Sequence, residues 1–413
     1  MDSIVPMHLS AFELSLLNGD SGPAARKAMQ ILAALGKIYE AEAMIPVSSV
    51  QISGVSYDNL GDAGLEFLAE MANGGGKARV LTTLNPAGMD VENWQALGIP
   101  ADFASKQMQV IEAFARMGVI TTCTCTPYLV GSLPHFGEHI AWAESSAVCF
   151  ANSVLGARTN REGGPSALAA TLTGLTPAYG YHLDEYRIPT ITIRVAARVS
   201  GTHEFGALGM VIGKVLEAAK LKPLPYIQGI PGATLEELKS FCASIATYGG
   251  CALFHMQGIT PEASLHTPPA KSLTILQAEL DQAVLSLTAS RQTSASSNPG
   301  LLPDLYSLGC PHLSLREIAR LAELLEGKTV KKELWITTAR PTRDAAERMG
   351  YVRIIEAAGA KIAADTCCVV TPIGGRFNTL VTDSAKACYY AYAKNAFNTR
   401  FLSFEQVIAE ALE

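Results

Sequence analysis

Three cysteines stand at positions where predicted β-strands give way to turns. They are Cys125 in TTCTCTPYL (121–129), Cys310 in SLGCPHLS (307–314) and Cys367 in AADTCCVVTP (363–372). In α/β proteins, ligand-binding groups gather at the carboxyl ends of parallel strands. Thiolates are also side chains that hold zinc ions and iron-sulfur clusters. The three positions therefore suggest one shared inorganic ligand, with core packing as the alternative for each cysteine taken alone.

The remaining cysteines and the local sequence refine this hypothesis. The chain has nine cysteines but no CxxC pair, which argues against a zinc ribbon and a thioredoxin-like site. Ser314 and Glu317 form a capping box, so a helix is predicted to begin just after Cys310, where its dipole would favour the thiolate. Four cysteines in apolar segments are predicted to pack in the core, namely Cys149, Cys242, Cys251 and Cys388.

The segments that must position these thiols alternate between strand-like and helical patterns. A capping box at Ser10 and Glu13 opens a helical region, and further helix is predicted over 25–41 and 62–72. This alternation predicts an α/β fold with several lobes and parallel or mixed sheets. Strands are predicted at 47–57, 77–86, 118–127, 188–197, 251–261, 332–341 and 360–372.

Four of the predicted strands end alike, with hydroxyl, thiol or amide side chains followed by proline. The endings are TTLNP (82–86), TTCTCTP (121–127), TTARP (337–341) and DTCCVVTP (365–372). Proline stops a strand and threonine suits its last residues, so any single ending is compatible with ordinary turn chemistry. The four together predict one polar rim formed by strand ends.

The length of 413 residues exceeds what one hydrophobic core usually supports. Segments rich in Pro, Gly, Ser and Asn at 220–234 and 291–304 are the predicted connectors. They divide the chain into lobes 1–220, 221–300 and 301–413. Only 17% of the residues are charged, against roughly 25% in an ordinary soluble domain, which favours an oligomer or a complex.

The charge and the N-terminal sequence exclude several kinds of partner. A net charge of −6 offers no electrostatic footprint for nucleic acid. No apolar run approaches the roughly 18 residues of a membrane span, so no membrane partner is expected. The N-terminus lacks the basic region of a secretory signal, which predicts a cytoplasmic protein with reduced cysteines.

A second group of reactive side chains lies in NSVLGARTNREGG (152–164), with two arginines, two asparagines and a glutamate between small residues. Arginine binds carboxylate or phosphate in a bidentate manner, and glycine permits close approach of the backbone. The segment predicts a binding site for a small anionic molecule. The alternative is a salt-bridged loop between helices.

Two local motifs suggest other chemistry. His135 and His139 in HFGEH match the H-x-x-E-H pattern of zinc peptidases, which requires both histidines on one helical face and makes a zinc hydrolase an alternative. Gly206, Gly209 and Gly213 miss the spacing of a dinucleotide-binding loop. We expect these glycines to permit close helix packing.

Nine separated segments, in order, resemble the large catalytic part of the aconitase X family. They are GVSYDNLGDAG (54–64), TTLNPAG (82–88), TCTPYL (124–129), GEHIAWAESSAV (137–148), NSVLGARTNREGGPSALAA (152–170), YGYHLDE (179–185), GCPHLSL (309–315), DTCCVVTPI (365–373) and DSAKACYY (383–390). The resemblance spans nearly the whole chain, residues 1–413. It implies an aconitase-like fold with α/β lobes around a central cluster site.

The resemblance implies an iron-sulfur hydro-lyase in which Cys125, Cys310 and Cys367 hold the cluster. It also implies a separate small subunit that carries the swivelling domain, which this chain lacks. The catalytic base is not assigned, since it could come from that partner. The residues expected to contact the substrate are Ser56, Tyr57, Asn85, Arg158, Asn160, Arg161, Glu162 and Lys386.

Members of the family dehydrate cis-3-hydroxy-L-proline or mevalonate 5-phosphate. The alanine-rich, charge-poor composition lacks the Lys/Glu enrichment of hyperthermophiles and favours cis-3-hydroxy-L-proline, which would give Δ1-pyrroline-2-carboxylate. A two-chain arrangement resembles the phosphomevalonate enzymes, so mevalonate 5-phosphate is the alternative substrate. A non-catalytic binding subunit is a third possibility.

Overall fold

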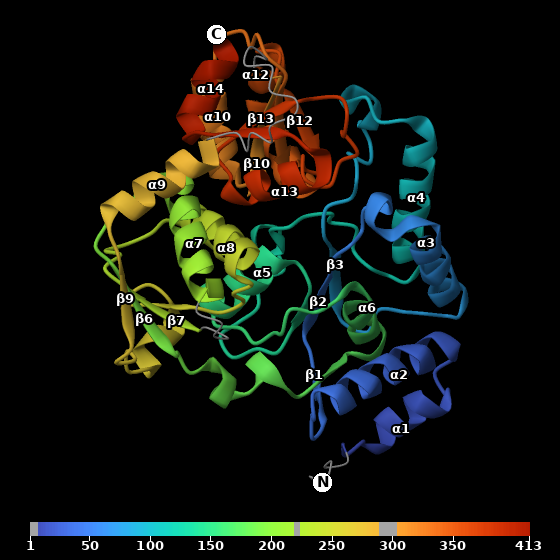
Figure 1. The fold of residues 1–413 in the computed structure, drawn as a ribbon. Helices are drawn as coiled ribbons and strands as arrows, with labels where there is room; N and C mark the ends of the chain where they lie inside the picture. Colours follow the sequence, from blue (N-terminus) through green and yellow to red (C-terminus); the bar gives the residue numbers. More distant parts are fainter. Residues whose placement is uncertain (1–6, 219–223, 289–303) are drawn as a thin grey trace.

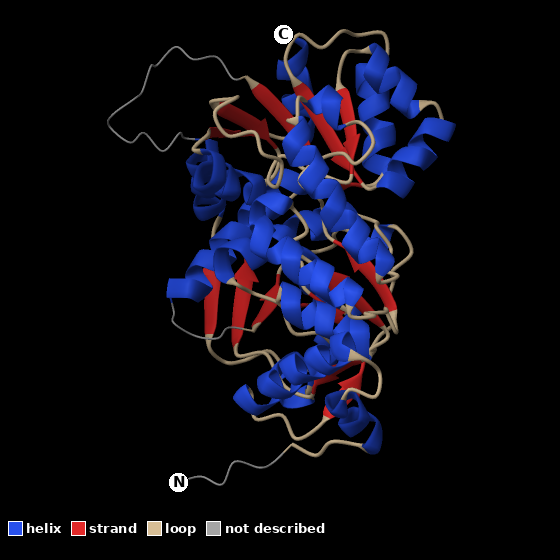
Figure 2. Ribbon diagram, turned by 90° about the vertical axis from the view of Figure 1, so that its right-hand side faces the viewer, coloured by secondary structure: helices blue, strands red, loops and turns tan. Residues whose placement is uncertain are grey.

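The computed structural model describes residues 7–218, 224–288 and 304–413. Helices surround several separate sheets, which confirms the predicted α/β class (Figures 1 and 2). Three of these sheets are entirely parallel, and helices connect most of their consecutive strands. No described helix combines the length and the apolar character that crossing a membrane requires.

The N-terminal part contains a parallel sheet of three strands in the order β3-β2-β4. Its strands are β2 (Ser49–Ile52), β3 (Leu81–Leu84) and β4 (Ala141–Trp142). The helices around it are α1 (Ala11–Asn18), α2 (Pro23–Ile38), α3 (Tyr57–Asn73), α4 (Ala101–Arg116), α5 (Ser145–Phe150) and α6 (Gly164–Thr173). An antiparallel pair, β1 (Met44–Pro46) and β5 (Leu175–Pro177), lies beside them.

Local signals explain where some of these elements begin and end. The predicted capping box at Ser10 and Glu13 is present at the start of α1. The strand predicted at 118–127 is wrong, because only Ile120 bridges β3 and the chain then turns through Cys123, whose φ is 43°. Threonines and cysteines with high strand propensity thus form a loop here, which shows how tertiary context overrides propensity.

The middle of the chain forms a parallel sheet in the order β8-β7-β6-β9. Its strands are β6 (Ile191–Val195), β7 (Pro225–Gln228), β8 (His255–Met256) and β9 (Ser272–Ile275), with helices α7 (Gly201–Ala218), α8 (Leu235–Gly249) and α9 (Gln277–Thr288). The predicted lobe boundary at 220/221 falls inside this unit, because β6 pairs with β7. The strand predicted at 251–261 shrinks to β8.

The C-terminal part forms a parallel sheet in the order β12-β11-β10-β13-β14. Its strands are β10 (Leu305–Leu313), β11 (Leu334–Thr338), β12 (Lys361–Ala364), β13 (Thr379–Thr382) and β14 (Asn398–Phe401). Its helices are α10 (Leu315–Leu325), α11 (Arg340–Arg348), α12 (Tyr351–Ala357), α13 (Ala385–Asn395) and α14 (Phe404–Leu412). The predicted capping box of Ser314 and Glu317 opens α10. The boundary predicted at 300/301 lies outside the described residues.

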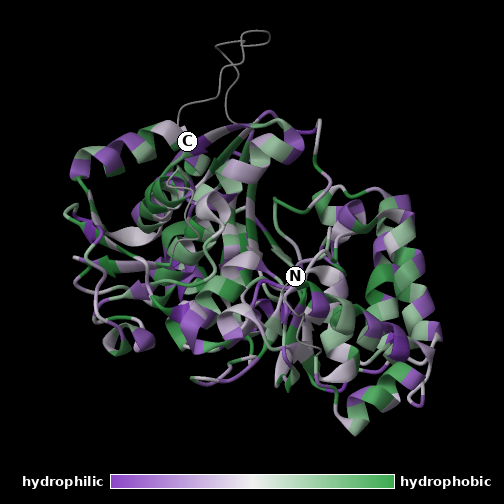
Figure 3. Ribbon diagram, turned by 60° about the horizontal axis from the view of Figure 1, so that its bottom comes forward, coloured by the Kyte–Doolittle hydropathy of each residue, from purple (hydrophilic) through white to green (hydrophobic). Residues whose placement is uncertain are grey.

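Helices α7 and α8 pack closely at the centre of the molecule (Figure 1). A Cβ at Gly209 would lie 2.9 Å from the carbonyl oxygen of Phe241, and one at Gly213 would lie 2.8 Å from the amide nitrogen of Gly249. The glycines of α7 therefore allow the close packing that was predicted. Hydrophobic residues run along the packed strands and helices, while the outer helices also carry hydrophilic stretches (Figure 3).

Candidate metal centre

The three cysteines predicted to share a ligand lie near the carboxyl ends of strands in two different sheets. Cys310 lies within the register shift between β10 and β11, and Cys367 lies just past the end of β12. Cys125 follows the segment whose Ile120 bridges Thr83 of β3. The strand order of the five-stranded sheet reverses at β10, which is where crevices form in open α/β sheets.

Residues in unusual backbone conformations precede Cys310 and Cys367 and set the direction of their side chains. Gly309 has a φ of 114°, and a Cβ there would lie 2.2 Å from the carbonyl oxygen of Thr337, so only glycine fits before Cys310. Asp365, two residues before Cys367, has a φ of 66° in the left-handed region that few non-glycine residues adopt. Such strain is found mainly where the surrounding structure over-determines the backbone, as at ligand sites.

The buried side chain of His312 connects the three cysteine segments. Its backbone N–H donates to Cys125 Sγ at 3.3 Å. Its ring nitrogens lie 3.0 Å from Thr124 Oγ1 and 2.9 Å from the carbonyl oxygen of Thr366. Since His312 follows Cys310 by two residues, one imidazole holds together the backbone beside all three thiols.

The thiols influence one another electrostatically. Burial raises the pKa of the Cys125 thiol well above its ordinary value, and Glu144 and Cys367 raise it further. Burial, followed by the effect of Cys367, raises the pKa of Cys310 to about 12. In the chain alone, burial therefore favours the neutral thiol of Cys310. A bound metal would deprotonate a coordinating thiol in any case.

The spacing of the three sulfur atoms distinguishes between two kinds of ligand. Around one tetrahedral zinc ion with bonds of about 2.3 Å, sulfur atoms lie roughly 3.8 Å apart. Among the described residues, these three sulfurs do not all lie within 4.8 Å of one another. The arrangement therefore does not match a single tetrahedral zinc ion, and the expectation of an iron-sulfur cluster rests on the family resemblance.

A buried ion pair lies beside the thiols. Lys386 Nζ donates to Glu144 Oε1 at 2.5 Å, and the two side chains are 11% and 5% exposed. Burial disfavours the ammonium, but Glu144 and then Cys310 outweigh it and raise the pKa of Lys386. Burial likewise favours the neutral acid, yet Lys386 keeps the pKa of Glu144 below its ordinary value. The pair is therefore charged at neutral pH.

A second set of charges holds the loop that leads to Cys367. Arg340 Nη2 lies 2.7 Å from Asp90 Oδ1, and Arg340 Nε lies 3.2 Å from Asp365 Oδ2. Asp90 Oδ2 also accepts from the backbone N–H of Ala364 at 2.8 Å. Burial raises the pKa of Asp365 to about 6 although Arg340 opposes this change. Three of the four predicted endings, near 86, 340 and 365, thus lie on one polar rim, whereas the fourth, 121–127, is not the end of a strand.

Three of the predicted substrate contacts lie at the carboxyl edge of the three-stranded sheet. Ser56 follows β2 and donates to the carbonyl oxygen of Val370 at 3.3 Å, in the loop after Cys367. Asn85 follows β3, and its Oδ1 is buried and has no hydrogen-bond partner within the described parts of the chain. Arg161 is exposed, and none of the described residues pairs with its guanidinium. These side chains and Lys386 are the ones best placed to meet a ligand.

The other predicted contacts are engaged elsewhere. Tyr57 donates from its hydroxyl to Asp62 at 2.9 Å, on the outer side of α3. Arg158 donates to the carbonyl oxygen of His182 at 3.0 Å and pairs with Asp184. Asn160 is hydrogen-bonded to the backbone of Tyr179 and Tyr181. Glu162 accepts hydrogen bonds from the hydroxyl groups of Ser166 and Thr176. Much of 152–164 is therefore a bonded loop, and Arg161 alone of the two arginines is unpaired.

The H-x-x-E-H motif does not form the helix that a zinc peptidase requires. Residues 134–138 form a turn in which Gly137 has a φ of 76°. Glu138 accepts from the backbone N–H of His135 at 2.6 Å, while His139 Nδ1 lies 3.0 Å from His182 Nδ1. The two histidines therefore do not share a helical face, which removes the structural basis for the zinc-hydrolase alternative.

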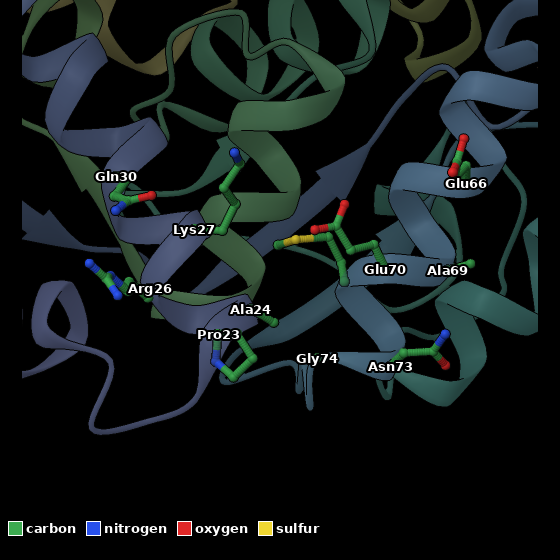
Figure 4. A pocket seen from close by; sticks show the side chains of 11 residues that line it. Pro23, Ala24, Arg26, Lys27, Gln30, Glu66, Ala69, Glu70, Asn73 and Gly74 are labelled. Carbon is green, nitrogen blue, oxygen red and sulfur yellow. The ribbon is translucent and has the colours of Figure 1, made fainter.

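The molecule also has a surface hollow of about 750 Å³ between α2 and α3 (Figure 4). Its lining includes Arg26, Lys27, Glu66 and Glu70, and none of the predicted site residues. This hollow therefore lies apart from the reactive side chains. We place the functional site at the thiols, because Cys125 and Cys310 each interact electrostatically with Cys367 and a charged pair lies beside them.

Two residues of the centre were not singled out from the sequence. Glu144 caps α5 by accepting from the backbone N–H of Ala147 at 2.7 Å, and His312 bridges the cysteine segments. The ESS triplet after a short strand was the available signal for Glu144. Nothing local to His312 distinguishes it from a core histidine.

Comparison with known proteins agrees with this architecture. Family models match in order, Aconitase X first domain over residues 6–185, second domain over 189–285 and third domain over 303–413. The crystal structure of Thermococcus kodakaraensis aconitase X (holo-form) superposes with a TM-score of 0.89 at 42% identity, covering 98% of this chain and 100% of that one.

Curated relatives are named as dehydratases. The phosphomevalonate dehydratase large subunit of Methanocaldococcus jannaschii is 45% identical over 395 residues, covering 93% of this chain and 95% of that protein. The cis-3-hydroxy-L-proline dehydratase of Pseudomonas aeruginosa is 34% identical over 420 residues, covering 98% of this chain and 70% of that protein. The chain therefore belongs to the aconitase X family of hydro-lyases.

Proposed function

We propose that the chain is the large subunit of an iron-sulfur-dependent mevalonate 5-phosphate dehydratase. The convergence of Cys125, Cys310 and Cys367 on one rim carries the proposal. The choice of substrate rests on similarity, since the phosphomevalonate enzyme of M. jannaschii matches almost end to end at 45% identity. This reverses the preference for cis-3-hydroxy-L-proline that composition suggested, because that relative is 34% identical and is covered only to 70%.

The residues present fit a cluster with three protein ligands. The three thiols would hold it, and the partial exposure of Cys310 leaves one side open to substrate. When bound, the cluster supplies a Lewis-acidic iron for the hydroxyl that leaves. Lys386 places a positive charge beside the thiolates and so offsets their negative charge in a site of low dielectric.

The reaction removes a proton from the carbon next to the substrate carboxylate and hydroxide from the following carbon, leaving a double bond and water. Arg161 offers an exposed, unpaired guanidinium suited to the carboxylate or the phosphate. Asn85 offers an unpartnered buried oxygen at the same edge. We assign the proton-accepting base to a small subunit, since the relatives' name implies one and Glu144 is already paired with Lys386.

The test is an anaerobic assay of this chain purified together with its small subunit. We expect elimination of water from mevalonate 5-phosphate and little turnover of cis-3-hydroxy-L-proline. Arg161→Gln should raise KM by about tenfold or more, as expected when a charged hydrogen bond to an anion is lost. Arg194→Gln, on an exposed position of β6, is the matched control and should not change KM.

Preference for cis-3-hydroxy-L-proline would overturn the substrate assignment while leaving the cluster intact. A brown protein without turnover of either substrate, even with the small chain present, would favour the binding-subunit alternative.

A further inference from the structure

A second group of potential metal ligands lies in the middle part of the chain, away from the cysteines. His255 lies in β8, Glu262 lies in the short helix η6 (Pro261–Leu265), and His266 ends that helix. One ligand atom from each lies within 4.8 Å of those of the other two. The imidazole rings of the two histidines have centroids 4.5 Å apart.

The hydrogen bonds of His255 leave one of its ring nitrogens available to bind a metal ion. It is fully buried, and its Nε2 lies 2.8 Å from the carbonyl oxygen of Arg187. Because a carbonyl can only accept, Nε2 must carry the proton and Nδ1 must present a lone pair. That Nδ1 is buried and has no hydrogen-bond partner among the described residues. Metal-binding histidines are commonly oriented in this way, by donating their other N–H to a backbone carbonyl.

Glu262 is fixed by an arginine that is itself held rigidly. Arg187 donates to both carboxylate oxygens, with Nη2 at 2.7 Å from Oε1 and Nε at 3.0 Å from Oε2. Its remaining N–H groups donate to Asn152, Ala157 and Tyr181. Oε2 accepts only one of these bonds, so it retains a lone pair for another ligand.

His266 supplies the access to this group. It is only partly buried, whereas His255 and Glu262 are buried. The exposed carboxylate of Asp184, which is paired with Arg158, also lies within electrostatic range of His266. The partly exposed ring of His266 therefore lies between solvent and the buried lone pair of His255.

We propose that His255, Glu262 and His266 bind a divalent transition-metal ion, zinc in the first instance. Two imidazoles and one carboxylate are a donor set typical of zinc, and water would occupy the remaining coordination position. Calcium and magnesium are disfavoured, because they prefer oxygen ligands throughout. This site does not depend on the cysteine cluster or on the proposed dehydration.

The test uses cobalt(II) as the coloured substitute for zinc and the full-length chain carrying Cys125→Ser, Cys310→Ser and Cys367→Ser, so that the thiols cannot hold the ion. We expect one equivalent to bind with weak visible bands and without sulfur-to-cobalt charge transfer. Zinc should displace it. His266→Ala in the same background should weaken binding by about tenfold or more. His135→Ala removes an exposed histidine elsewhere and is the matched control.

Equal cobalt affinity of the His266→Ala and His135→Ala proteins would overturn the proposal, as would the absence of bound cobalt in a parent that circular dichroism shows to be folded. If the triple variant does not fold, the wild-type chain is used, since charge-transfer bands separate thiol-bound cobalt from this site. His266→Ala should leave the brown colour of the anaerobic wild-type chain unchanged, which separates failure here from failure of the proposed function.

Discussion

The four-stranded and five-stranded sheets share one architecture but differ in what lies beyond their strand ends. Each has a central strand, β6 or β10, from which the strand order grows first to one side and then to the other. Each also has a glycine pressed against a neighbouring strand, since a Cβ at Gly229 or at Gly309 would lie 2.2 Å from the carbonyl oxygen of Val195 or Thr337. Both sheets therefore create the same kind of crevice.

The difference lies in the residues at that crevice. At the ends of β6 and β7 lie Val195, Ala197 and Ile230, which belong to the hydrophobic core. Beyond the five-stranded sheet stand Cys310 and Lys386. The topology thus supplies a place for a ligand, and the side chains at the strand ends decide whether that place becomes a core or a site.

The largest expected effect separates the rim cysteines from a core cysteine. Replacing Cys125, Cys310 or Cys367 by alanine should abolish the visible absorption of anaerobically purified protein and lower kcat by more than about 100-fold, beyond the loss typical when a hydrogen-bond partner of a ligand is removed. Cys242→Ala, in the core around α8, should keep both colour and activity. A colourless Cys242 variant that remains folded would show that loss of colour is not specific to Cys125, Cys310 and Cys367.

The next effect concerns the buried charge pair. Lys386→Ala leaves the Glu144 carboxylate buried and unpaired, so we expect a loss of about 3–5 kcal/mol in the free energy of unfolding. Adding Glu144→Gln should restore part of this loss. Lys106→Ala breaks an exposed pair with Asp62 and should leave the free energy of unfolding nearly unchanged. Urea denaturation measures all three, and equal losses for the two lysines would contradict the burial argument.

The paired glycines sharpen the comparison further. Gly309→Ala and Gly229→Ala both force a Cβ towards a carbonyl oxygen from a positive φ, so each should destabilise the fold by at least about 1–3 kcal/mol. Only Gly309→Ala should also reduce the iron content, because it displaces Cys310. Iron analysis of the folded fraction decides this, and equal iron loss in both variants would show that general destabilisation is the cause.

The change with the least bearing on the cysteine site is a dependence of stability on pH. Burial raises the pKa of Asp383, at the end of β13, from 3.8 to about 7. Between these values the folded state keeps a proton that the unfolded state has released, so stability should fall as pH rises, by up to about 1.4 kcal/mol per pH unit. Asp383→Asn should flatten this slope. If Asp383→Asn left the slope unchanged in urea titrations from pH 4 to 7, another group would be responsible for the pH dependence.

Much of the fold could be predicted from local sequence rules, whereas the site could be predicted only in part. The capping boxes at Ser10 and Ser314 and most strands could be placed because they depend on neighbours in the sequence. The loop through Cys123 could not, since its strand-like residues are held by contacts with β3. The roles of Arg158 and Asn160 in a bonded loop, and of Glu144 beside Lys386, depend on partners distant in sequence, which motif position alone does not reveal.

The most direct measurement is anomalous diffraction at the iron absorption edge from crystals of this chain grown without oxygen. The account predicts one compact iron peak bonded to the sulfur atoms of Cys125, Cys310 and Cys367. Iron bound only at other residues, or three free thiols in a protein that catalyses the dehydration, would contradict it.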